Sequence, residues 1–370
     1  MKILFDLTPL YDHLTGIERY NANITKRIIE EHTNDNYVLV FKKEVHADFK
    51  TIVKMPNVET VILEPCNKFV FIQWRLYKAV KKIDADYYVF LSFTAPVLLR
   101  KKGIINAIHD LTCWDVPDTI PLKMRYYYRI AYHYAIKNSK YIITVSEFSK
   151  KRIIERYKLS DDKVYVVYDG LSDNFKESVK KETEEIKNKY HLPDEFYLSL
   201  STIEPRKNLQ LLIQAYQELL DENKDIPDLV LAGRMGWQLE QVIGGLKEET
   251  RNKIIFTGFV DDDDLPALYS MAALFIFPSR YEGFGLPVIE AMSQGTLVLC
   301  SDAASLPEVV GDGAVMFKSD DKESLKNKLL HISQMLSDEK KNIKDRAKVI
   351  CEKYDWNLEA EKLYGKLNEF

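Results

Sequence analysis

Short apolar runs of strand length alternate with helical patterns along most of this chain, and this alternation most limits the fold that the chain can adopt. Runs such as residues 2–7 and 87–90 are almost continuously apolar, as expected for strands buried on both faces of a sheet. The other strand-like runs are residues 37–41, 60–63, 103–108, 141–145, 164–168, 196–200, 228–232, 253–257, 274–278 and 296–300. Helical spacing of apolar residues falls between most of them, as in residues 17–31. The sequence therefore predicts an α/β protein of βαβ units with mostly parallel sheets.

The length of 370 residues exceeds the size at which a single hydrophobic core usually stops growing, so two domains are expected. A strongly charged segment at residues 171–194 separates two series of strand-like runs, which is typical of a linker and a first surface helix. We therefore predict an N-terminal domain at residues 1–170 and a C-terminal domain at residues 195–352, followed by a last segment at residues 353–370.

The composition excludes several classes of protein. No apolar run reaches the ~18 residues of a membrane-spanning helix, and an acid at position 6 interrupts the first apolar run too early for a signal peptide. We therefore expect a cytoplasmic protein. The four cysteines show no CxxC spacing, which argues against a zinc site. Four consecutive aspartates at residues 261–264 precede a helical pattern, so we expect them to cap that helix rather than to bind a metal.

The charge is distributed unevenly. Residues 1–170 hold 27 Lys and Arg against 20 Asp and Glu, whereas the remainder holds 25 against 36. A basic half favours an anionic partner. The helical stretch at residues 121–140 alternates tyrosines with cations such as Lys123, Arg125 and Arg129, which suits an anionic membrane surface but equally suits a core-packing helix with a solvated basic face. No nucleic-acid recognition motif accompanies it, so we expect no nucleic-acid partner.

A glycine-rich turn leads directly into a short helix at residues 280–295. Gly283 and Gly285 allow close approach of a ligand to the backbone, Pro287 suits the start of a helix, and Gly295 suits its end. The predicted helix spans residues 287–294. Its N-terminus, with unpaired amides and the positive end of the helix dipole, would then face the turn. Such a construction is typical of a phosphate site.

Two carboxylates flank this construction. Glu282 lies in the turn and Glu290 about one turn inside the helix, so we expect the carboxyl groups to lie on the order of 10 Å apart. That separation is too long for the ~5 Å pair of a retaining glycosidase. A ligand with a sugar at one end, a nucleoside at the other and phosphates between would use both carboxylates. The alternative is that one is a solvated loop residue and the other a helix-surface charge.

Other candidates follow predicted strands, where open parallel sheets bind ligands. Arg206 and Lys207 occupy a strand-to-helix loop in the second half, and adjacent cations there suit a diphosphate. Gly16 lies at the corresponding turn in the first half, although no GxGxxG pattern is present. His109 follows the run at residues 103–108, so its imidazole would face the same edge of the sheet. Each of these residues could instead be structural, as a lone histidine usually is.

In combination and order, these residues resemble the family-4 retaining glycosyltransferases, whose GT-B fold has two Rossmann-like domains facing each other across a cleft. The resemblance covers nearly the whole chain. Its motifs are Glu-Gly-Phe-Gly-Leu-Pro-Val-Ile-Glu from Glu282, Glu-Pro-Arg-Lys-Asn from Glu204, Phe-Thr-Gly-Phe-Val from Phe256, Ser-Leu-Pro-Glu-Val-Val-Gly from Ser305, and Tyr-Asp-Trp-Asn from Tyr354. The last motif precedes what looks like the family's final helix, which crosses back onto the N-terminal domain.

The resemblance implies a role for each candidate. Glu282 would hold donor-sugar hydroxyls near the reacting carbon, and Glu290 would hold the ribose. Arg206 and Lys207 would neutralise the leaving diphosphate, and His109 would lie near the donor sugar and the acceptor. The backbone amides of Gly283, Phe284, Gly285 and Leu286 would contact sugar and phosphate, and Gly16 would border the same phosphates from the other domain. Enzymes of this family generally need no bound metal and no cofactor beyond the nucleotide-sugar substrate.

The resemblance further implies transfer of a sugar with retention of configuration, from a nucleotide-diphosphate sugar bound by the C-terminal domain to a saccharide acceptor bound by the N-terminal domain. The sequence at residues 232–237 and 305–308 looks most like that of bacterial enzymes that use mannose or rhamnose donors in capsule or O-antigen assembly. A lipid-linked acceptor and a peripheral position at the inner face of the membrane stay open. Two alternatives also stay open: a nucleotide-sugar epimerase of the same fold, and a non-catalytic nucleotide-sugar-binding protein.

Overall fold

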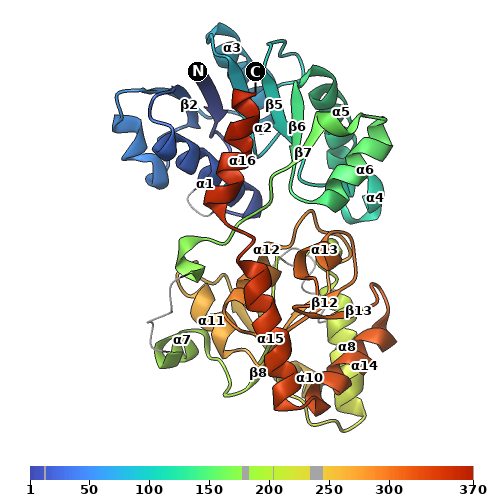
Figure 1. Ribbon diagram of the computed structural model, residues 1–370. Helices are drawn as coiled ribbons and strands as arrows, with labels where there is room; N and C mark the ends of the chain where they lie inside the picture. Colours follow the sequence, from blue (N-terminus) through green and yellow to red (C-terminus); the bar gives the residue numbers. More distant parts are fainter. Residues whose placement is uncertain (12–13, 177–182, 203, 234–244, 370) are drawn as a thin grey trace. The chain divides into compact units, whose positions relative to one another are not determined.

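The computed structural model describes residues 1–11, 14–176, 183–202, 204–233 and 245–369. Its contacts divide the chain into two compact units, of which the first comprises Met1–Gly170 with Asp355–Phe370 and the second Leu171–Tyr354 (Figure 1). Both ends of the chain therefore belong to the first unit. The sequence placed boundaries after residues 170 and 352, whereas the contacts change unit after residues 170 and 354.

The first unit is built on a seven-stranded parallel sheet with the strand order β3-β2-β1-β4-β5-β6-β7. The strands are β1 (Lys2–Asp6), β2 (Asn36–Lys42), β3 (Val58–Leu63), β4 (Tyr87–Phe90), β5 (Ile104–Ala107), β6 (Tyr141–Thr144) and β7 (Val164–Val166). The order reverses between β1 and β4. In open sheets of this kind, ligands bind beyond the carboxyl ends of the strands at that reversal.

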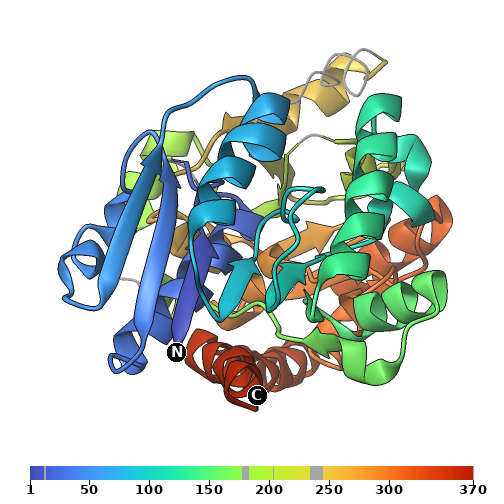
Figure 2. The ribbon, with the colours of Figure 1, turned by 90° about the horizontal axis from the view of Figure 1, so that it is seen from above.

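Helices cover both faces of this sheet. They are α1 (Gly16–Glu31), α2 (Lys68–Val70), α3 (Tyr77–Lys82), α4 (Thr112–Asp115), α5 (Leu122–Asn138), α6 (Glu147–Tyr157) and α16 (Trp356–Asn368), with a π-helical segment η3 (Phe71–Leu76) and short 3₁₀ turns η1 (Ala47–Phe49), η2 (Ile52–Lys54), η4 (Pro117–Thr119) and η5 (Asp161–Lys163). Leu76 and Val80 pack on Val38 and Phe90 in one buried cluster. The C-terminal helix α16 packs on α1, near the N-terminus of the chain (Figure 2).

The second unit repeats this plan with a six-stranded parallel sheet in the order β10-β9-β8-β11-β12-β13. Its strands are β8 (Phe196–Leu200), β9 (Asp228–Ala232), β10 (Ile254–Gly258), β11 (Leu274–Phe277), β12 (Val298–Ser301) and β13 (Val315–Phe317). Its helices are α7 (Thr183–Tyr190), α8 (Leu209–Asp221), α10 (Glu248–Asn252), α11 (Leu265–Met271), α12 (Leu286–Ser293), α13 (Leu306–Val310), α14 (Lys322–Gln334) and α15 (Ser337–Cys351), with the turns η6 (Asp173–Phe175) and η7 (Pro205–Lys207). Here the order reverses between β8 and β11.

The expected α/β fold with parallel sheets is confirmed, and β4, β8 and β9 have the predicted bounds. The helix expected at residues 287–294 begins and ends one residue earlier, as α12. The capping role expected for the aspartate run is wrong at Asp264, which directly precedes α11. Its carboxylate makes no cap hydrogen bond to the helix and instead accepts hydrogen bonds from Lys189 Nζ (2.6 Å) and Tyr190 Oη (2.8 Å).

Candidate active site

The strand reversal of the second sheet brings two loops together. Arg206 and Lys207 lie in η7 directly after β8, and residues 279–282 follow β11, the neighbouring strand. The backbone N–H of Arg280 donates to the carbonyl of Arg206 (2.8 Å), which joins the two loops. Residues separated by about 75 positions in sequence therefore lie side by side at the carboxyl edge of the sheet. This is the position at which an open parallel sheet binds its ligand.

The carboxylate of Glu282 is the centre of this site. Its side chain is buried, with 6% of the residue exposed. Arg206 Nη1 donates to Oε2 (2.8 Å), while Lys207 Nζ (2.7 Å) and Ser279 Oγ (2.5 Å) donate to Oε1. Arg206 Nη1 also donates to the carbonyl of Tyr281 (2.9 Å), which fixes the guanidinium over the loop. One buried carboxylate therefore holds two cations in place.

The charges of this cluster determine its protonation. Burial alone would raise the pKa of Glu282, but the positive charges of Arg206 and Lys207 outweigh burial and, with hydrogen bonds from Lys207 and Ser279, lower the pKa to about 2. Burial lowers the pKa of the Lys207 ammonium, and the charge of Glu282 opposes that change. At neutral pH Glu282 is therefore an anion.

Ser305 fixes the turn between Glu282 and α12 by hydrogen bonds. Its hydroxyl donates to the carbonyls of Glu282 (3.0 Å) and Phe284 (2.9 Å), so the N-terminus of α12 has a fixed position. Gly285, the residue before the helix, has φ +114°, and a Cβ atom there would lie 2.8 Å from Leu306 Cδ2. The positive φ favours glycine at this position, and any larger residue would also displace the Leu306 side chain. The eight-residue helix α12 thus starts directly behind the Glu282 cluster.

Glu290 lies inside α12 and is also buried, with 4% of the residue exposed. Tyr269 Oη, from α11, donates to its Oε2 (3.0 Å). The Tyr269 ring itself packs edge to face on Phe275, with ring centroids 5.2 Å apart. The alternative of a helix-surface charge is therefore wrong for Glu290, as the solvated-loop alternative is for Glu282.

His109 belongs to the first unit and follows the carboxyl end of β5. Its Nε2 lies 2.6 Å from the carbonyl oxygen of Leu91, and because a carbonyl only accepts, Nε2 carries the proton. The imidazole packs edge to face on Tyr20, with centroids 5.0 Å apart, and Tyr20 Oη donates to the carbonyl of Val167 (3.1 Å). Burial lowers the pKa of His109. The ring is therefore neutral near pH 7, with Nδ1 as its hydrogen-bond acceptor.

Gly16 also lies beyond the carboxyl end of β1, as the exposed first residue of α1 rather than in the preceding turn. The backbone N–H of Thr15 donates to the Glu18 carboxylate (3.1 Å), which caps this helix.

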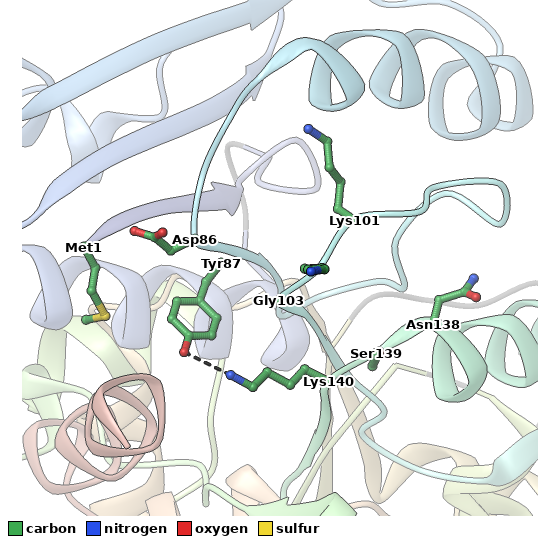
Figure 3. A pocket seen from close by; sticks show the side chains of 9 residues that line it. Met1, Asp86, Tyr87, Lys101, Gly103, Asn138, Ser139 and Lys140 are labelled. Atoms are coloured by element: carbon green, nitrogen blue, oxygen red, sulfur yellow. Dashed lines mark hydrogen bonds between the residues drawn. The ribbon is translucent and has the colours of Figure 1, made fainter. Parts of the chain in front are cut away.

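A hollow of about 700 Å³ opens elsewhere on the first unit, where β4 and β5 begin (Figure 3). Its lining residues are Met1, Asp86, Tyr87, Lys101, Lys102, Gly103, Asn138, Ser139 and Lys140. Lys101 Nζ donates to the carbonyl of Ile83 (2.9 Å), and Lys140 Nζ donates to Tyr87 Oη (3.3 Å). Both lysines therefore stabilise the local structure of the first unit. His109 lies at the opposite end of β5. None of the site residues predicted from the sequence lines this hollow.

Comparisons with known proteins decide the family. Residues 14–175 match the family described as Glycosyltransferase Family 4, and residues 180–350 match Glycosyl transferases group 1. The O-antigen chain mannosyltransferase B of Escherichia coli is 32% identical over 351 residues, covering 92% of this chain and 91% of the relative. The chain is a family-4 glycosyltransferase. The O-antigen chain mannosyltransferase RfbU of Salmonella typhimurium is 26% identical and covers 90% of this glycosyltransferase and 91% of the relative.

Solved structures confirm the GT-B fold of this glycosyltransferase. The structure of Anabaena HepE in complex with UDP-glucose superimposes with a TM-score of 0.75 at 18% identity, covering the whole of both chains. WaaG, a glycosyltransferase involved in lipopolysaccharide biosynthesis, gives a TM-score of 0.74 at 15% identity and covers 99% of both chains. At these identities the likeness concerns the fold alone.

The geometry joins some of the candidates in ways that the sequence did not predict. Arg206 and Lys207 were expected at phosphate and Glu282 at sugar, yet both cations form ion pairs with Glu282. Ser279 and Tyr269, the neutral partners of the two glutamates, were missed, because a serine after a strand and a tyrosine in a helix carry no distinctive pattern. Among the described residues, no group of three or more His, Cys, Asp or Glu side chains has the arrangement of a metal site.

Proposed function

We propose that this glycosyltransferase is a mannosyltransferase of bacterial O-antigen assembly, which moves mannose from a nucleotide-diphosphate sugar to a saccharide acceptor with retention of configuration and without a bound metal. The names of its two long relatives, both O-antigen chain mannosyltransferases, support the sugar and the pathway. The prediction of a mannose or rhamnose donor rested on residues 232–237 and 305–308, and residues 234–237 lie outside the described part of the chain.

A single observation carries the proposed chemistry: the buried Glu282 carboxylate bonded to both Arg206 and Lys207 beside the start of α12. Cleavage between an anomeric carbon and a diphosphate builds negative charge on the leaving oxygens and positive charge on the sugar ring. Arg206, Lys207 and the N-terminal end of α12 favour the first charge, and the Glu282 carboxylate favours the second. Glu290 would hold the ribose, with its carboxylate positioned by the hydrogen bond from Tyr269.

The cluster also supports retention without a covalent intermediate. Both oxygens of Glu282 are engaged by cations and by Ser279, and its low pKa makes it a weak nucleophile. We therefore propose same-face substitution, in which the leaving phosphate takes the proton of the acceptor hydroxyl. Two protein cations at the diphosphate would supply the charge that a metal supplies in other transferases. The imidazole of His109 is neutral, and its Nδ1 would accept a hydrogen bond from a hydroxyl of the sugar.

The test is nucleotide release from a panel of nucleotide sugars, with and without an α-linked mannose disaccharide, in buffer with and without EDTA. We expect a mannose donor to be used fastest, release to rise with the acceptor, the new linkage to have the donor's anomeric configuration by NMR, and EDTA to have no effect. An inverted product or a covalent adduct on Glu282 would contradict retention by this route. Acceptor-independent release of free nucleotide indicates an epimerase, and binding without release indicates a non-catalytic protein.

We also propose that the first unit docks on the anionic cytoplasmic face of a membrane. On α5, Leu122, Tyr126 and Ile130 recur every fourth residue and are each more than half exposed, beside the exposed Lys123. The ring of Phe69, also exposed, contacts Tyr127 of the same helix with centroids 6.1 Å apart. An exposed apolar stripe with an adjacent lysine suits an anionic lipid surface. Among the described helices, none is long and apolar enough to cross a membrane.

Vesicle flotation tests this surface. We expect the Tyr126→Ser and Ile130→Ser double variant to lose most of its binding to vesicles with 30% anionic lipid, while Val349→Ser, a matched exposed apolar residue on α15, keeps it. Lys123→Gln should weaken binding mainly at low salt. Arg125 and Arg129 are unsuitable for this test because their guanidinium groups donate to the carbonyls of Pro117 and Cys113. Unchanged flotation of the double variant would disprove membrane docking here.

A further inference from the structure

The direction of the His109 imidazole depends on more than its hydrogen bond. Its Nε2 donates to the carbonyl of Leu91 (2.6 Å), and Ser149 Oγ donates to the carbonyl of His109 itself (3.2 Å). Nε2 lies close to the Cβ–Cγ axis about which the ring turns, so the bond to Leu91 restricts that rotation only weakly. Nδ1, the atom proposed to accept from the sugar, lies farther from the axis. Its direction is therefore set by what packs against the ring.

Tyr20, on α1, provides this packing. The two rings meet edge to face, with an angle of 86° between their planes and centroids 5.0 Å apart, an arrangement that aromatic rings favour. Tyr20 is fully buried, and its Oη donates to the carbonyl of Val167 (3.1 Å). Burial and the charges of Asp169 and Glu359 raise the pKa of Tyr20, so its hydroxyl keeps the proton that it donates. The Tyr20 ring is therefore fixed at its far end and limits the rotation of His109.

Trp356, the first residue of α16, packs on Tyr20 as well. The two rings lie 5.8 Å apart between centroids and are inclined by 71°. Trp356 is fully buried, and among the described residues its Nε1 has no hydrogen-bond partner. A buried donor without a partner is costly to the folded state, so the indole is explained by its packing rather than by a polar contact. Trp356 thus supports the Tyr20 ring through shape alone.

The segments that connect the two units meet at this group of rings. Gly170 is the last residue before the chain leaves the first unit, and Trp356 is the second residue after it returns. A Cβ atom on Gly170 would lie 2.7 Å from the backbone nitrogen of Trp356 and 2.8 Å from its indole ring. The backbone N–H of Leu171 donates to the carbonyl of Tyr354 (2.9 Å), so the segments are also paired. Tyr20 therefore contacts the first-unit end of each connecting segment.

We propose that Tyr20 is a positioning residue for His109 and that Trp356 acts on His109 through Tyr20, so that the segments joining the two units set the direction of Nδ1. This inference rests on the proposed role of His109 at the sugar and adds the residues that orient its ring. It also gives a function to the Tyr-Asp-Trp-Asn motif, which served in the sequence only as a mark of the family.

Nuclear magnetic resonance of the histidine side chains tests this positioning without an activity assay. Long-range ¹H–¹⁵N spectra give the tautomer and the pKa of each imidazole, and His109→Gln identifies the His109 signals. In the wild type we expect a proton on Nε2 and a pKa below 6.5, because burial outweighs the charges of Asp110 and Glu18, which act on the ring. Tyr20→Leu admits water beside the imidazole, so it should raise that pKa by about 0.5 or more and populate both tautomers.

Steady-state kinetics of the same full-length variants tests the consequence for the reaction. Tyr20→Leu should lower kcat about tenfold and change the KM of the donor less than about twofold, since a displaced Nδ1 harms the transition state more than binding. Tyr20→Phe keeps the ring and should restore most of kcat and the wild-type pKa of His109. Trp356→Leu and Gly170→Ala leave both rings chemically unchanged, and we expect them to shift both measurements in the direction of Tyr20→Leu.

Tyr37→Leu is the matched control for loss of a buried tyrosine. Tyr37 is fully buried in the same unit, its ring stacks on Phe5, and its Oη donates to the carbonyl of Ile28 (3.3 Å). Removal of this ring should lower the melting temperature about as much as Tyr20→Leu does, because both substitutions leave a cavity. It should leave kcat and the His109 signals as they are in the wild type.

The outcomes separate this proposal from the proposed function. His109 signals that stay unchanged in Tyr20→Leu overturn the positioning role, and so does a Tyr37→Leu variant that shifts them equally. A Tyr20→Phe variant as impaired as Tyr20→Leu also overturns it, because the ring is then not the feature that matters. A wild-type kcat in His109→Gln, beside shifted signals in Tyr20→Leu, overturns the role of His109 in transfer but supports Tyr20 as the group that orients it. If Tyr20→Leu does not fold, Gly170→Ala decides by the same criteria.

Discussion

Replacement of Glu282 by glutamine is expected to lower kcat by about 10²–10³-fold, the range found when a group that stabilises transition-state charge is removed. The substitution keeps the shape of the side chain but removes the negative charge that we propose stabilises the developing positive charge of the sugar ring. It also removes the anion that positions Arg206 and Lys207, to which both carboxylate oxygens are bonded. The affinity for the nucleotide should change little, because Arg206 and Lys207 both keep their positive charges for the diphosphate. Steady-state kinetics measures the change in kcat, and nucleotide titration measures the change in affinity.

Glu290→Gln is the matched control, since it removes the second buried carboxylate of the same region. We expect it to weaken nucleotide binding about tenfold, with a smaller effect on kcat, because its position inside α12 suits the ribose rather than the reacting carbon. Tyr269 Oη can still donate to the amide oxygen of the variant. If both substitutions lowered affinity and turnover by the same factors, the division of roles between the two glutamates would be wrong.

The strands could be predicted from the sequence because parallel strands buried on both faces are continuous apolar runs. The runs at β4, β8 and β9 gave their bounds directly. The pairing of strands that are distant in sequence, such as β8 with β11, is not contained in any local pattern. It depends on which helices cover which face, and only the resemblance to a known fold indicated it.

Single site residues were accessible to sequence reasoning, but their contacts were not. Arg206 and Glu282 were each recognised from a loop that follows a strand, and the ion pair between them depends on two loops meeting at the strand reversal. Asp264 shows the converse: its place before α11 suggested a cap, but the neighbouring α7 presents Lys189 and Tyr190, which compete successfully for the carboxylate. Local propensity therefore fails where a distant segment supplies a stronger partner.

Lys207→Met is expected to destabilise the folded protein by about 2–3 kcal/mol at pH 7, because removal of one partner of a buried ion pair leaves the other charge less compensated. The value lies below the full range for such pairs because Arg206 and Ser279 still donate to Glu282. The variant should also lose about 10²-fold in kcat, since it lacks one of the two cations that we propose stabilise the leaving diphosphate. Urea unfolding and steady-state kinetics provide the two measurements.

A double-mutant cycle with Glu282→Gln distinguishes the structural role of this pair from its catalytic role. The stability effects should be strongly non-additive, because the second substitution removes the charge that the first left uncompensated. The catalytic losses should persist in the double variant.

The dependence of stability on pH tests the charge of Glu282 independently. The pKa of Glu282 is lowered from 4.5 to about 2 in the folded state, so the carboxylate stabilises the fold above pH 4.5, and this contribution disappears as the pH falls towards 2. The difference in unfolding free energy between wild type and Glu282→Gln, on the order of 3 kcal/mol at pH 7, should therefore shrink steadily below pH 4.5. A difference that stayed constant down to pH 2.5 would show that the Glu282 carboxylate is not held by Arg206 and Lys207 in solution.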